Sequence, residues 1–94
     1  MKKGYVYILA SESGTLYIGV TSNLESRIAD HKAKRIPGFT SDYGCNKLLY
    51  VEAFEDIRNA ITREKQLKSG SRKMKLALIE SMNPSWRDFY DDLI

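Results

Sequence analysis

Two tyrosines, Tyr7 and Tyr17, flank a short polar turn in the stretch YVYILASESGTLYIGVT. The apolar and aromatic runs on either side of residues 11–14 predict a β-hairpin, because this cluster offers turn residues and a glycine for positive φ. We expect a register in which Tyr7 lies opposite Tyr17, since side chains alternate along a strand and this register collects the aliphatic residues on one face. The two phenols then meet on the other face.

A cation and a proton carrier follow on a predicted helix. Residues 24–34 form this helix, with Ser22 or Asn23 as its N-cap. Arg27 and His31 are four residues apart and therefore share a helix face. A guanidinium can donate two parallel hydrogen bonds to phosphate, and an imidazole titrates near neutral pH. The pair has the chemistry to bind and process a phosphate group.

A carboxylate occupies an unexpected place on the next predicted helix, which begins at Ile57 and ends just before Gly70. The apolar stripe of this helix comprises Ile57, Ala60, Ile61 and Leu67. Glu64 falls in the middle of it, where an unpaired carboxylate costs several kcal/mol. Glu64 therefore forms an ion pair with an arginine such as Arg27, shifts its pKa upward, or coordinates a cation. A hard cation that keeps most of its water suits a single carboxylate ligand.

The remaining elements complete a small α+β fold. Residues 48–54 read as a third strand, the segment IPGFTSDYGCN before it as a loop, and residues 71–82 as a basic helix. Asn83 and Pro84 predict the cap and first residue of a short last helix that carries Trp86. With 94 residues, 43% of them hydrophobic, we expect one domain over residues 1–94, with a three-stranded antiparallel sheet in ββαβαα order flanked by helices.

The charge is modest but unevenly distributed. The net charge is +3, and residues 57–79 hold seven cations against a single acid, Glu64. Such a stretch fits either a surface that attracts the phosphates of a nucleic acid or an ordinary solvated helix face. The candidate contacts to nucleic acid are Lys32, Lys34, Arg35, Arg63, Lys65, Lys68, Arg72 and Lys73.

Composition excludes several classes of protein. Cys45 is the only cysteine and His31 the only histidine, so neither an internal disulfide nor a Cys/His zinc site can form. This usage is consistent with a reducing compartment, and we expect a cytoplasmic location. The apolar runs are too short to span a bilayer, so no membrane partner is expected.

These motifs together resemble the GIY-YIG nuclease superfamily. The half-motifs are YVY at 5–7 and YIG at 17–19; Arg27 and His31 follow in NLESRIADHK, and Glu64 in AITREKQLK. The resemblance covers essentially the whole chain and is closest to the small stand-alone URI-type group, through phrases such as LYIGVT, GFT and REKQLK. Val20 stands where some relatives carry a lysine.

The resemblance implies a role for each candidate residue. Tyr7 is the general base toward water, Arg27 the charge clamp on phosphate, and Glu64 the only protein ligand of one Mg²⁺ or Mn²⁺ ion. Tyr17 and His31 orient water or phosphate and relay protons, although Tyr17 also fits a purely packed aromatic. The remaining implied residues order the site, and they are Gly19 and the late asparagine, Asn83.

The function implied is that of a metal-dependent endonuclease acting on DNA, including single-stranded or structured DNA, with low sequence specificity. Its partner is then DNA, with RNA left open, and we expect a monomer with oligomers left open. The alternative is a non-catalytic nucleic-acid-binding module with the same fold. A purely structural domain gives no reason for Glu64 within an apolar stripe.

Overall fold

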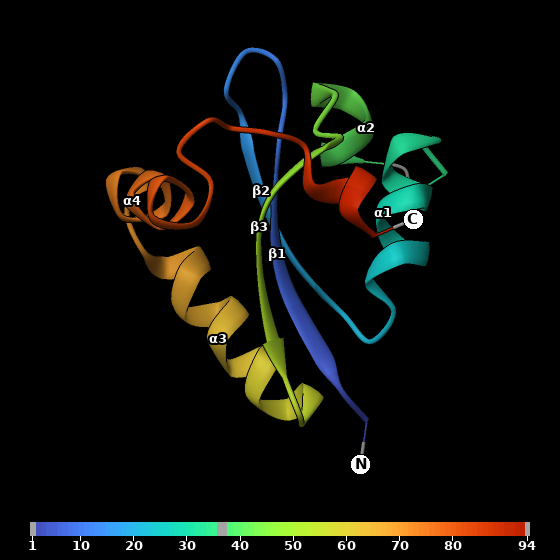
Figure 1. Cartoon of the computed structure of the whole chain (residues 1–94), viewed down its shortest axis with the longest axis vertical. Coiled ribbons are helices and arrows are strands. Elements are labelled where there is room, and N and C mark those ends of the chain that lie inside the picture. Colours follow the sequence, from blue (N-terminus) through green and yellow to red (C-terminus); the bar gives the residue numbers. More distant parts are fainter. Residues whose placement is uncertain (1, 36–37, 94) are drawn as a thin grey trace.

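The computed structural model describes residues 2–35 and 38–93. Within these residues, three strands and four α-helices, with a closing 3-10 helix, follow one another along the chain (Figure 1). Their bounds are β1 Gly4–Ala10, β2 Leu16–Thr21, α1 Leu24–Lys32, α2 Phe39–Tyr43, β3 Lys47–Phe54, α3 Ile57–Ser69, α4 Arg72–Met82 and η1 Phe89–Asp92. The predicted α+β fold with a three-stranded antiparallel sheet is confirmed.

The sheet has the order β2-β1-β3, with both neighbours antiparallel to the central β1. The predicted register of the hairpin is wrong by two residues: Tyr7 pairs with Gly19, and Tyr17 pairs with Leu9. The turn closes through Ser11, which places the pairing two residues further along β2. A shift of two keeps every side chain on its expected face, because the side-chain period of a strand is also two.

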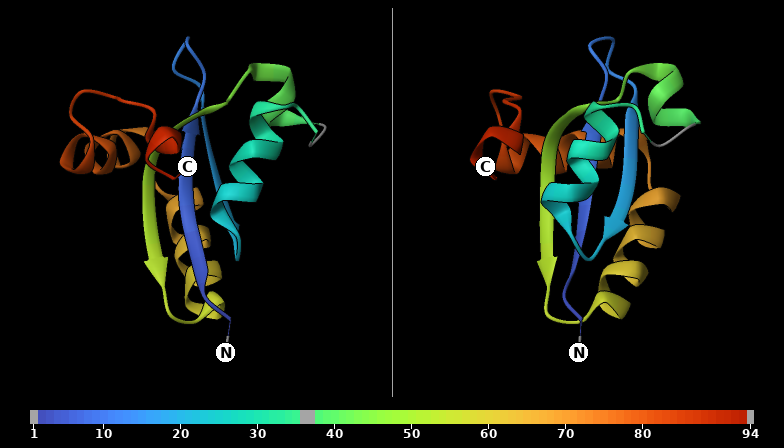
Figure 2. Two further views of the ribbon diagram at one scale, coloured as in Figure 1. Left: turned by 45° about the vertical axis from the view of Figure 1, so that its right-hand side comes forward. Right: turned by 90° about the vertical axis from the view of Figure 1, so that its right-hand side faces the viewer.

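The two faces of the sheet differ in what covers them. On one face, the aliphatic side chains of β1 and β2 pack against α3 and α4 through residues such as Ala60, Leu67 and Ile79. On the other face, Tyr7 and Leu9 pack with Ile28 of α1 and with η1. Figure 2 shows α1 and α3 on opposite sides of the sheet. Burial of both faces makes the sheet the central layer of the fold.

The long helices begin at side-chain caps. Asn23 rather than Ser22 caps α1, accepting a hydrogen bond from the Ser26 N–H at 3.2 Å. Asp56 caps α3 and Ser71 caps α4 in the same way. Each cap satisfies a backbone donor that the helix leaves free and so sets where the helix begins. The cap of α1 thereby determines which residues of that helix meet the sheet.

Two expectations about loops are wrong. The described part of the expected loop contains the helix α2, which ends at Gly44 in the left-handed conformation with φ 65°. Five residues are too few to show a helical period, so the pattern did not reveal this helix. Asn83 ends α4 rather than beginning a new helix, and η1 begins later, after Asp88. The buried side chain of Asn83 explains why α4 ends there, and its contacts are described below.

Among the helices of the described residues, none has the length and apolar character needed to cross a membrane.

Candidate functional site

Tyr7 lies at the centre of β1 and is almost fully buried, with 2% of its surface exposed. Its cross-strand neighbour is Gly19, the glycine of the YIG motif. A Cβ atom at position 19 would overlap the ring and the hydroxyl of Tyr7. The glycine therefore makes room for the phenol, which is a physical reason for a glycine at this point of the motif.

The Tyr7 hydroxyl is the first member of a buried chain of hydrogen bonds. Its oxygen lies 2.9 Å from Nε2 of His31, and Nδ1 of His31 lies 3.1 Å from Oγ1 of Thr40. The three side chains come from β1, α1 and α2, and His31 and Thr40 are also buried. A phenol donates more readily than an aliphatic alcohol, so we assign Tyr7 O–H as donor to Nε2 and Nδ1–H as donor to Thr40.

The protonation states of this chain follow from burial. Burial is the main cause that lowers the pKa of His31, and the positive charge of Arg27 lowers it further, so the imidazole is neutral at pH 7. Burial is the main cause that raises the pKa of Tyr7 above its ordinary value, and the neighbouring Tyr17 raises it further. Tyr7 therefore holds its proton at rest, and the neutral imidazole beside it is the group that can accept that proton.

Tyr17 completes a cluster of three rings. Its ring centre lies 6.4 Å from that of Tyr7 and 5.5 Å from that of His31, and the Tyr7 and His31 centres are 5.8 Å apart. The tilted and edge-on geometries are those that aromatic pairs favour. The structure thus brings Tyr7, Tyr17 and His31 together as the sequence predicted, although Tyr7 and Tyr17 are not direct cross-strand partners.

Two charged candidates stand around the rings. Arg27 is exposed on α1, one turn before His31, and its charge lowers the pKa of Tyr7, whereas the charge of Glu64 raises it. Both charges therefore act on the Tyr7 phenol. The Glu64 side chain is only 15% exposed, and its Oε2 lies 3.2 Å from Nζ of Lys68. The ion pair of Glu64 is made with Lys68, one turn along α3, rather than with Arg27.

The residues present fit one kind of metal ion. In the described ranges no group of three or more His, Cys, Asp or Glu side chains lies together, so a fully protein-ligated site is not formed there. Glu64 offers a largely buried carboxylate close enough to act on Tyr7. A lone carboxylate matches Mg²⁺ or Mn²⁺, which are bound through one or two carboxylates and keep several water ligands.

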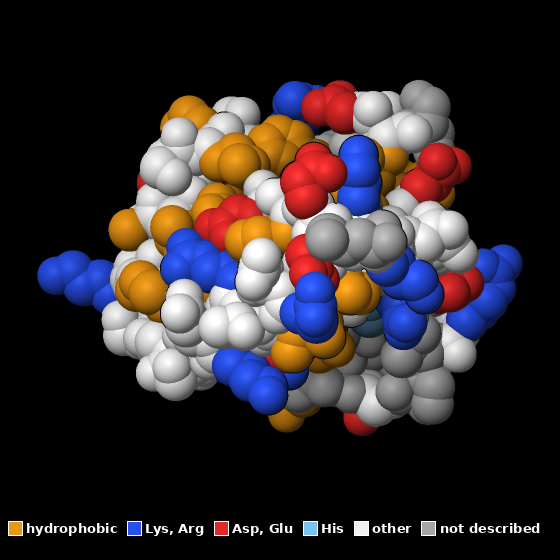
Figure 3. Space-filling model, turned by 90° about the horizontal axis from the view of Figure 1, so that it is seen from below, with side chains coloured by type: hydrophobic (Ala, Val, Ile, Leu, Met, Phe, Trp, Pro, Cys, Tyr) orange, Lys and Arg blue, Asp and Glu red, His pale blue; other side chains and the backbone are white. Residues whose placement is uncertain are grey.

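Several of the cations predicted to contact nucleic acid are already engaged within the fold. Arg63 donates two hydrogen bonds to Glu52, at 2.9 and 3.0 Å. Arg35 binds Asp30 at 3.2 Å, and Arg72 donates to the Gly14 carbonyl at 2.7 Å. Among the predicted contacts, those that are exposed and whose ammonium groups have no hydrogen bond or ion pair with another described residue are Lys34, Lys65 and Lys73. Figure 3 shows basic side chains interspersed with acidic ones on one face of the molecule.

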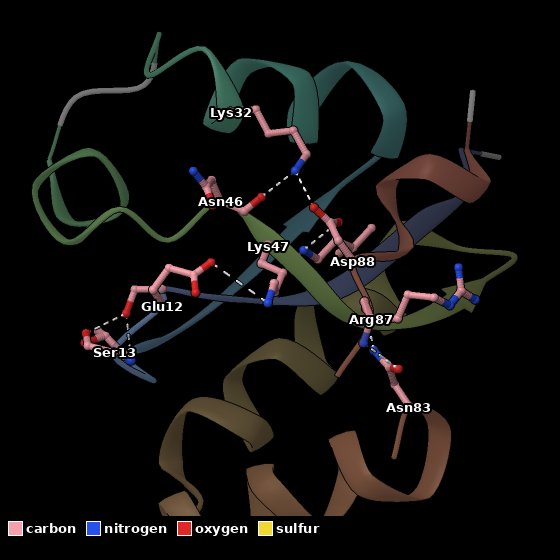
Figure 4. Close-up of polar contacts among 11 residues, drawn as sticks. Glu12, Ser13, Lys32, Asn46, Lys47, Asn83, Arg87 and Asp88 are labelled. Carbon is pink, nitrogen blue, oxygen red and sulfur yellow. Dashed lines mark hydrogen bonds and ion pairs between the residues drawn. The ribbon is translucent and has the colours of Figure 1, made fainter. Parts of the chain in front are cut away.

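Lys32 and Asn83 hold the C-terminal segment on the sheet (Figure 4). Lys32 donates to Asp88 at 2.5 Å and to the Asn46 carbonyl at 2.8 Å. The buried Asn83 donates to the Leu49 carbonyl at 3.3 Å, where β3 bulges and Leu49 has no partner on β1. Asn83 also exchanges hydrogen bonds with the backbone of residue 87. These contacts order the fold around the sheet and do not place Asn83 in contact with Tyr7.

Thr40 is the residue that the sequence analysis did not single out. It is 6% exposed and fixes the second nitrogen of His31. It stands in the GFT phrase, which was the available signal, but an isolated threonine in a segment read as a loop gave no reason to pair it with His31. The pairing depends on α2, which the sequence pattern did not predict.

Together these features define a class of protein: a small α+β domain with a tyrosine and histidine cluster on one sheet face and a carboxylate beside it. The model of the GIY-YIG catalytic domain matches residues 3–77. The chain therefore belongs to the GIY-YIG family.

Named relatives support this assignment. The chain is 40% identical over 80 residues to UPF0213 protein SH2523 of Staphylococcus haemolyticus, a match that covers 85% of this chain and 98% of the relative. It is 44% identical over 77 residues to UPF0213 protein CPE1444 of Clostridium perfringens, covering 82% and 83% of the two chains. The solution NMR structure of UPF0213 protein BH0048 of Bacillus halodurans matches with a TM-score of 0.60 and 28% identity, over 92% of each chain.

Proposed function

We propose that the protein is a metal-dependent endonuclease that hydrolyses phosphodiester bonds in DNA. Membership of a nuclease-type family supports this proposal in general. The observation that supports it most strongly is the buried hydrogen-bond chain from Tyr7 through His31 to Thr40, on which the charges of Arg27 and Glu64 act. A purely structural hydrogen-bond network does not require a cation and a carboxylate around a buried phenol.

Proton transfer is the first task of the proposed site. The attacking water gives its proton to the Tyr7 oxygen while the phenol proton passes to Nε2 of His31, 2.9 Å away. This coupled transfer avoids a free phenolate, which burial of Tyr7 disfavours. Nδ1–H donates to Thr40 and keeps Nε2 unprotonated before the reaction. A positioned acid-base pair of this kind contributes about 10² to 10⁴ in rate.

Charge stabilisation is the second task. The exposed guanidinium of Arg27 donates two hydrogen bonds to the non-bridging oxygens of the scissile phosphate, which a lysine cannot do with the same geometry. Glu64 would hold a divalent ion, which would neutralise charge that develops on the phosphoryl and leaving oxygens. In the structure this carboxylate is paired with Lys68, at 3.2 Å.

Sequence specificity is expected to be low. The proposed contacts from Arg27 and the lysines go to phosphate, which carries no base information. Both single-stranded and structured DNA are candidate substrates. Incubation with RNA tests whether the site requires deoxyribose rather than ribose. A non-catalytic nucleic-acid-binding module is the alternative function that the experiment must distinguish.

The decisive experiment incubates the pure protein with plasmid DNA, single-stranded DNA and RNA in the presence of Mg²⁺, Mn²⁺ or a chelator. We expect cleavage that depends on the metal ion and is lost in Glu64→Gln, which keeps the shape of the side chain but not its charge. Glu55→Gln is the matched control, because Glu55 is an exposed residue outside the site. Cleavage unaffected by Glu64→Gln would reject the site, and binding without cleavage under every condition would favour the alternative.

A further inference from the structure

A hollow beside the ring cluster has no role in the mechanism above. It measures about 290 Å³ and is lined by Leu16, Tyr17 and Ile18 of the edge strand β2, by Lys68 of α3 and by Lys75 of α4. Its volume lies near the lower limit of about 300 Å³ for small-molecule sites. The lining combines apolar side chains with two ammonium groups, which is a suitable environment for a small anionic group with an apolar body.

Lys75 is the cation in this hollow that is free to act. Among the residues that the structure describes, its ammonium has no hydrogen bond or ion pair, and the residue is half-buried. Lys68, by contrast, is 3.2 Å from Glu64. An ammonium beside apolar surface attracts an anion more strongly than one in bulk water, because the effective dielectric constant is lower there.

Tyr17 is shared by the hollow and the ring cluster, because it lines the hollow and its ring centre lies 5.5 Å from that of His31. Side chains alternate along β2, so Leu16 and Ile18 face α3 and α4 whereas Tyr17 faces Tyr7, and the hollow and the ring cluster lie on either side of one edge strand. A chain that crosses this edge at Tyr17 can therefore reach both places. A polynucleotide chain provides a group for each place, since each nucleotide repeats the same phosphate and sugar.

A specific contact holds the walls of the hollow together. Arg72, at the start of α4, donates to the carbonyl of Gly14 at 2.7 Å, just before β2 begins. The hairpin turn and the helix that carries Lys75 are thereby tied across 58 positions of the sequence. The corner between α3 and α4 lies beside the sheet (Figure 1). The hollow is thus preorganised by the fold.

We propose that this hollow binds the nucleotide adjacent to the scissile bond in the substrate strand, with its phosphate on Lys75 and Lys68 and its sugar or base against Leu16 and Ile18. The inference rests on the proposed endonuclease. It adds a second point of attachment, which orients the strand across Tyr17 and presents the next phosphate to Arg27. The ligand is a nucleotide unit of a polynucleotide.

The test measures the affinity for a fluorescently labelled DNA oligonucleotide in the presence of a chelator, so that no cleavage occurs. Lys75→Met removes the ammonium but keeps the length of the side chain, and Lys75→Arg keeps the charge. Lys3→Met removes an exposed charge just before β1 that does not line the hollow. One phosphate contact to a single strand contributes about 0.7 to the salt slope, so its loss lowers affinity about fourfold at about 150 mM salt and about eightfold at about 50 mM salt. We expect this loss in Lys75→Met, near-complete recovery in Lys75→Arg and a smaller effect in Lys3→Met.

The outcomes separate this inference from the proposed function. If Lys75→Met and Lys3→Met weaken binding equally while the protein cuts DNA, the nucleotide site is wrong and the endonuclease stands. If Lys75→Met alone weakens binding but no metal supports cleavage, the site stands as a binding site and the endonuclease is wrong. As a second readout, NMR amide shifts at residues 16–18 should respond to a thymidine dinucleotide and not to inorganic phosphate. An equal response to both would mean a general anion site and overturn the proposal.

Discussion

Two tyrosines are buried on opposite faces of the same sheet and have different kinds of partner. Tyr7 contacts the neutral imidazole of His31, whereas Tyr50 donates to the carboxylate of Glu52, which also accepts two hydrogen bonds from Arg63. Burial, together with the hydrogen bond to Glu52, raises the pKa of Tyr50 to about 12. Burial is the main reason why both phenols hold their protons at rest, and only Tyr50 also has a carboxylate as its acceptor.

Under the proposed function, this difference separates a structural cluster from one that transfers a proton. In the Tyr50 cluster the charges of Glu52 and Arg63 neutralise each other, and the cluster ties β3 to α3. In the Tyr7 cluster the acceptor is uncharged and can take a proton, and the nearby charges belong to groups outside the hydrogen-bond chain. Burial of a tyrosine is therefore not by itself a sign of function; the nature of its acceptor is more informative.

The largest expected effect comes from removing each phenol in turn. Tyr7→Phe should lower the single-turnover cleavage rate about 10²- to 10⁴-fold, because the proton path through the phenol is lost. Tyr50→Phe should leave the rate within about threefold, because Tyr50 lies on the other face of the sheet and its lost hydrogen bond is not at the reacting centre. Circular dichroism and thermal melting establish that both variants fold. Equal rates for the two variants would remove the distinction between the clusters.

The next effect concerns the orientation of His31. Thr40→Val keeps the shape of the side chain but removes the acceptor for Nδ1–H, so the proton moves to Nε2 and blocks transfer from Tyr7. We expect a decrease in rate of about 5- to 150-fold, the equivalent of about 1–3 kcal/mol for an unsatisfied buried donor. Thr40→Ser keeps the hydroxyl and should recover most of the rate. A pH–rate profile that is unchanged in Thr40→Val would show that Thr40 only packs.

A smaller effect is expected on stability rather than on rate. Glu52→Gln leaves the half-buried Arg63 without its charge partner and should lower the free energy of unfolding by about 1–3 kcal/mol. Asp92→Asn breaks the equally bidentate but exposed pair with Arg87 and should lower the free energy of unfolding less than Glu52→Gln does, because water screens an exposed pair. Urea unfolding measures both values. A loss of cleavage in folded Glu52→Gln would show that the two sheet faces are coupled.

The same two clusters show what sequence patterns can predict. Alternation along β1 predicted which face carries Tyr7, and helical spacing predicted that Arg27 and His31 share a face, because both depend only on local periods. The cross-strand partner of Tyr7 was wrong, since a register shift of two preserves the same alternation. Local periodicity therefore determines faces but not partners.

Most of the unpredicted contacts join residues from different elements. Thr40 meets His31 only because α2 forms, and this helix is too short to be recognised from its period. The bond between Asn83 and Leu49 depends on a bulge in β3, which the strand pattern does not reveal. The ion pair of Glu64 is an exception, because Lys68 lies four residues along the same helix and was available from spacing alone.

The smallest expected effect is a pH dependence of the free energy of unfolding, which arises from His31 on the Tyr7 face of the sheet. Burial, followed by Arg27, lowers the pKa of His31 in the folded protein, whereas His31 in the unfolded chain titrates near about 6.5. Below that pH the unfolded chain binds more protons than the folded protein. The free energy of unfolding should therefore fall as pH falls, by at most about 1.4 kcal/mol per pH unit, until the folded-state pKa is reached.

The other face should not contribute in this range. Tyr50 loses its proton only near pH 12, and the hydrogen bonds from Arg63 and Tyr50 outweigh burial and lower the pKa of Glu52, so the cluster keeps its charges between about pH 5 and 7. Since His31 is the only histidine of the chain, His31→Gln should remove most of the slope, whereas Glu52→Gln should lower stability equally at both pH values. Urea unfolding at about pH 7 and pH 5 measures these differences. If the slope persists in His31→Gln, the His31 imidazole is not the group that titrates. The assignment of His31 as a neutral acceptor for Tyr7, on which the comparison of the two tyrosines depends, would then be wrong.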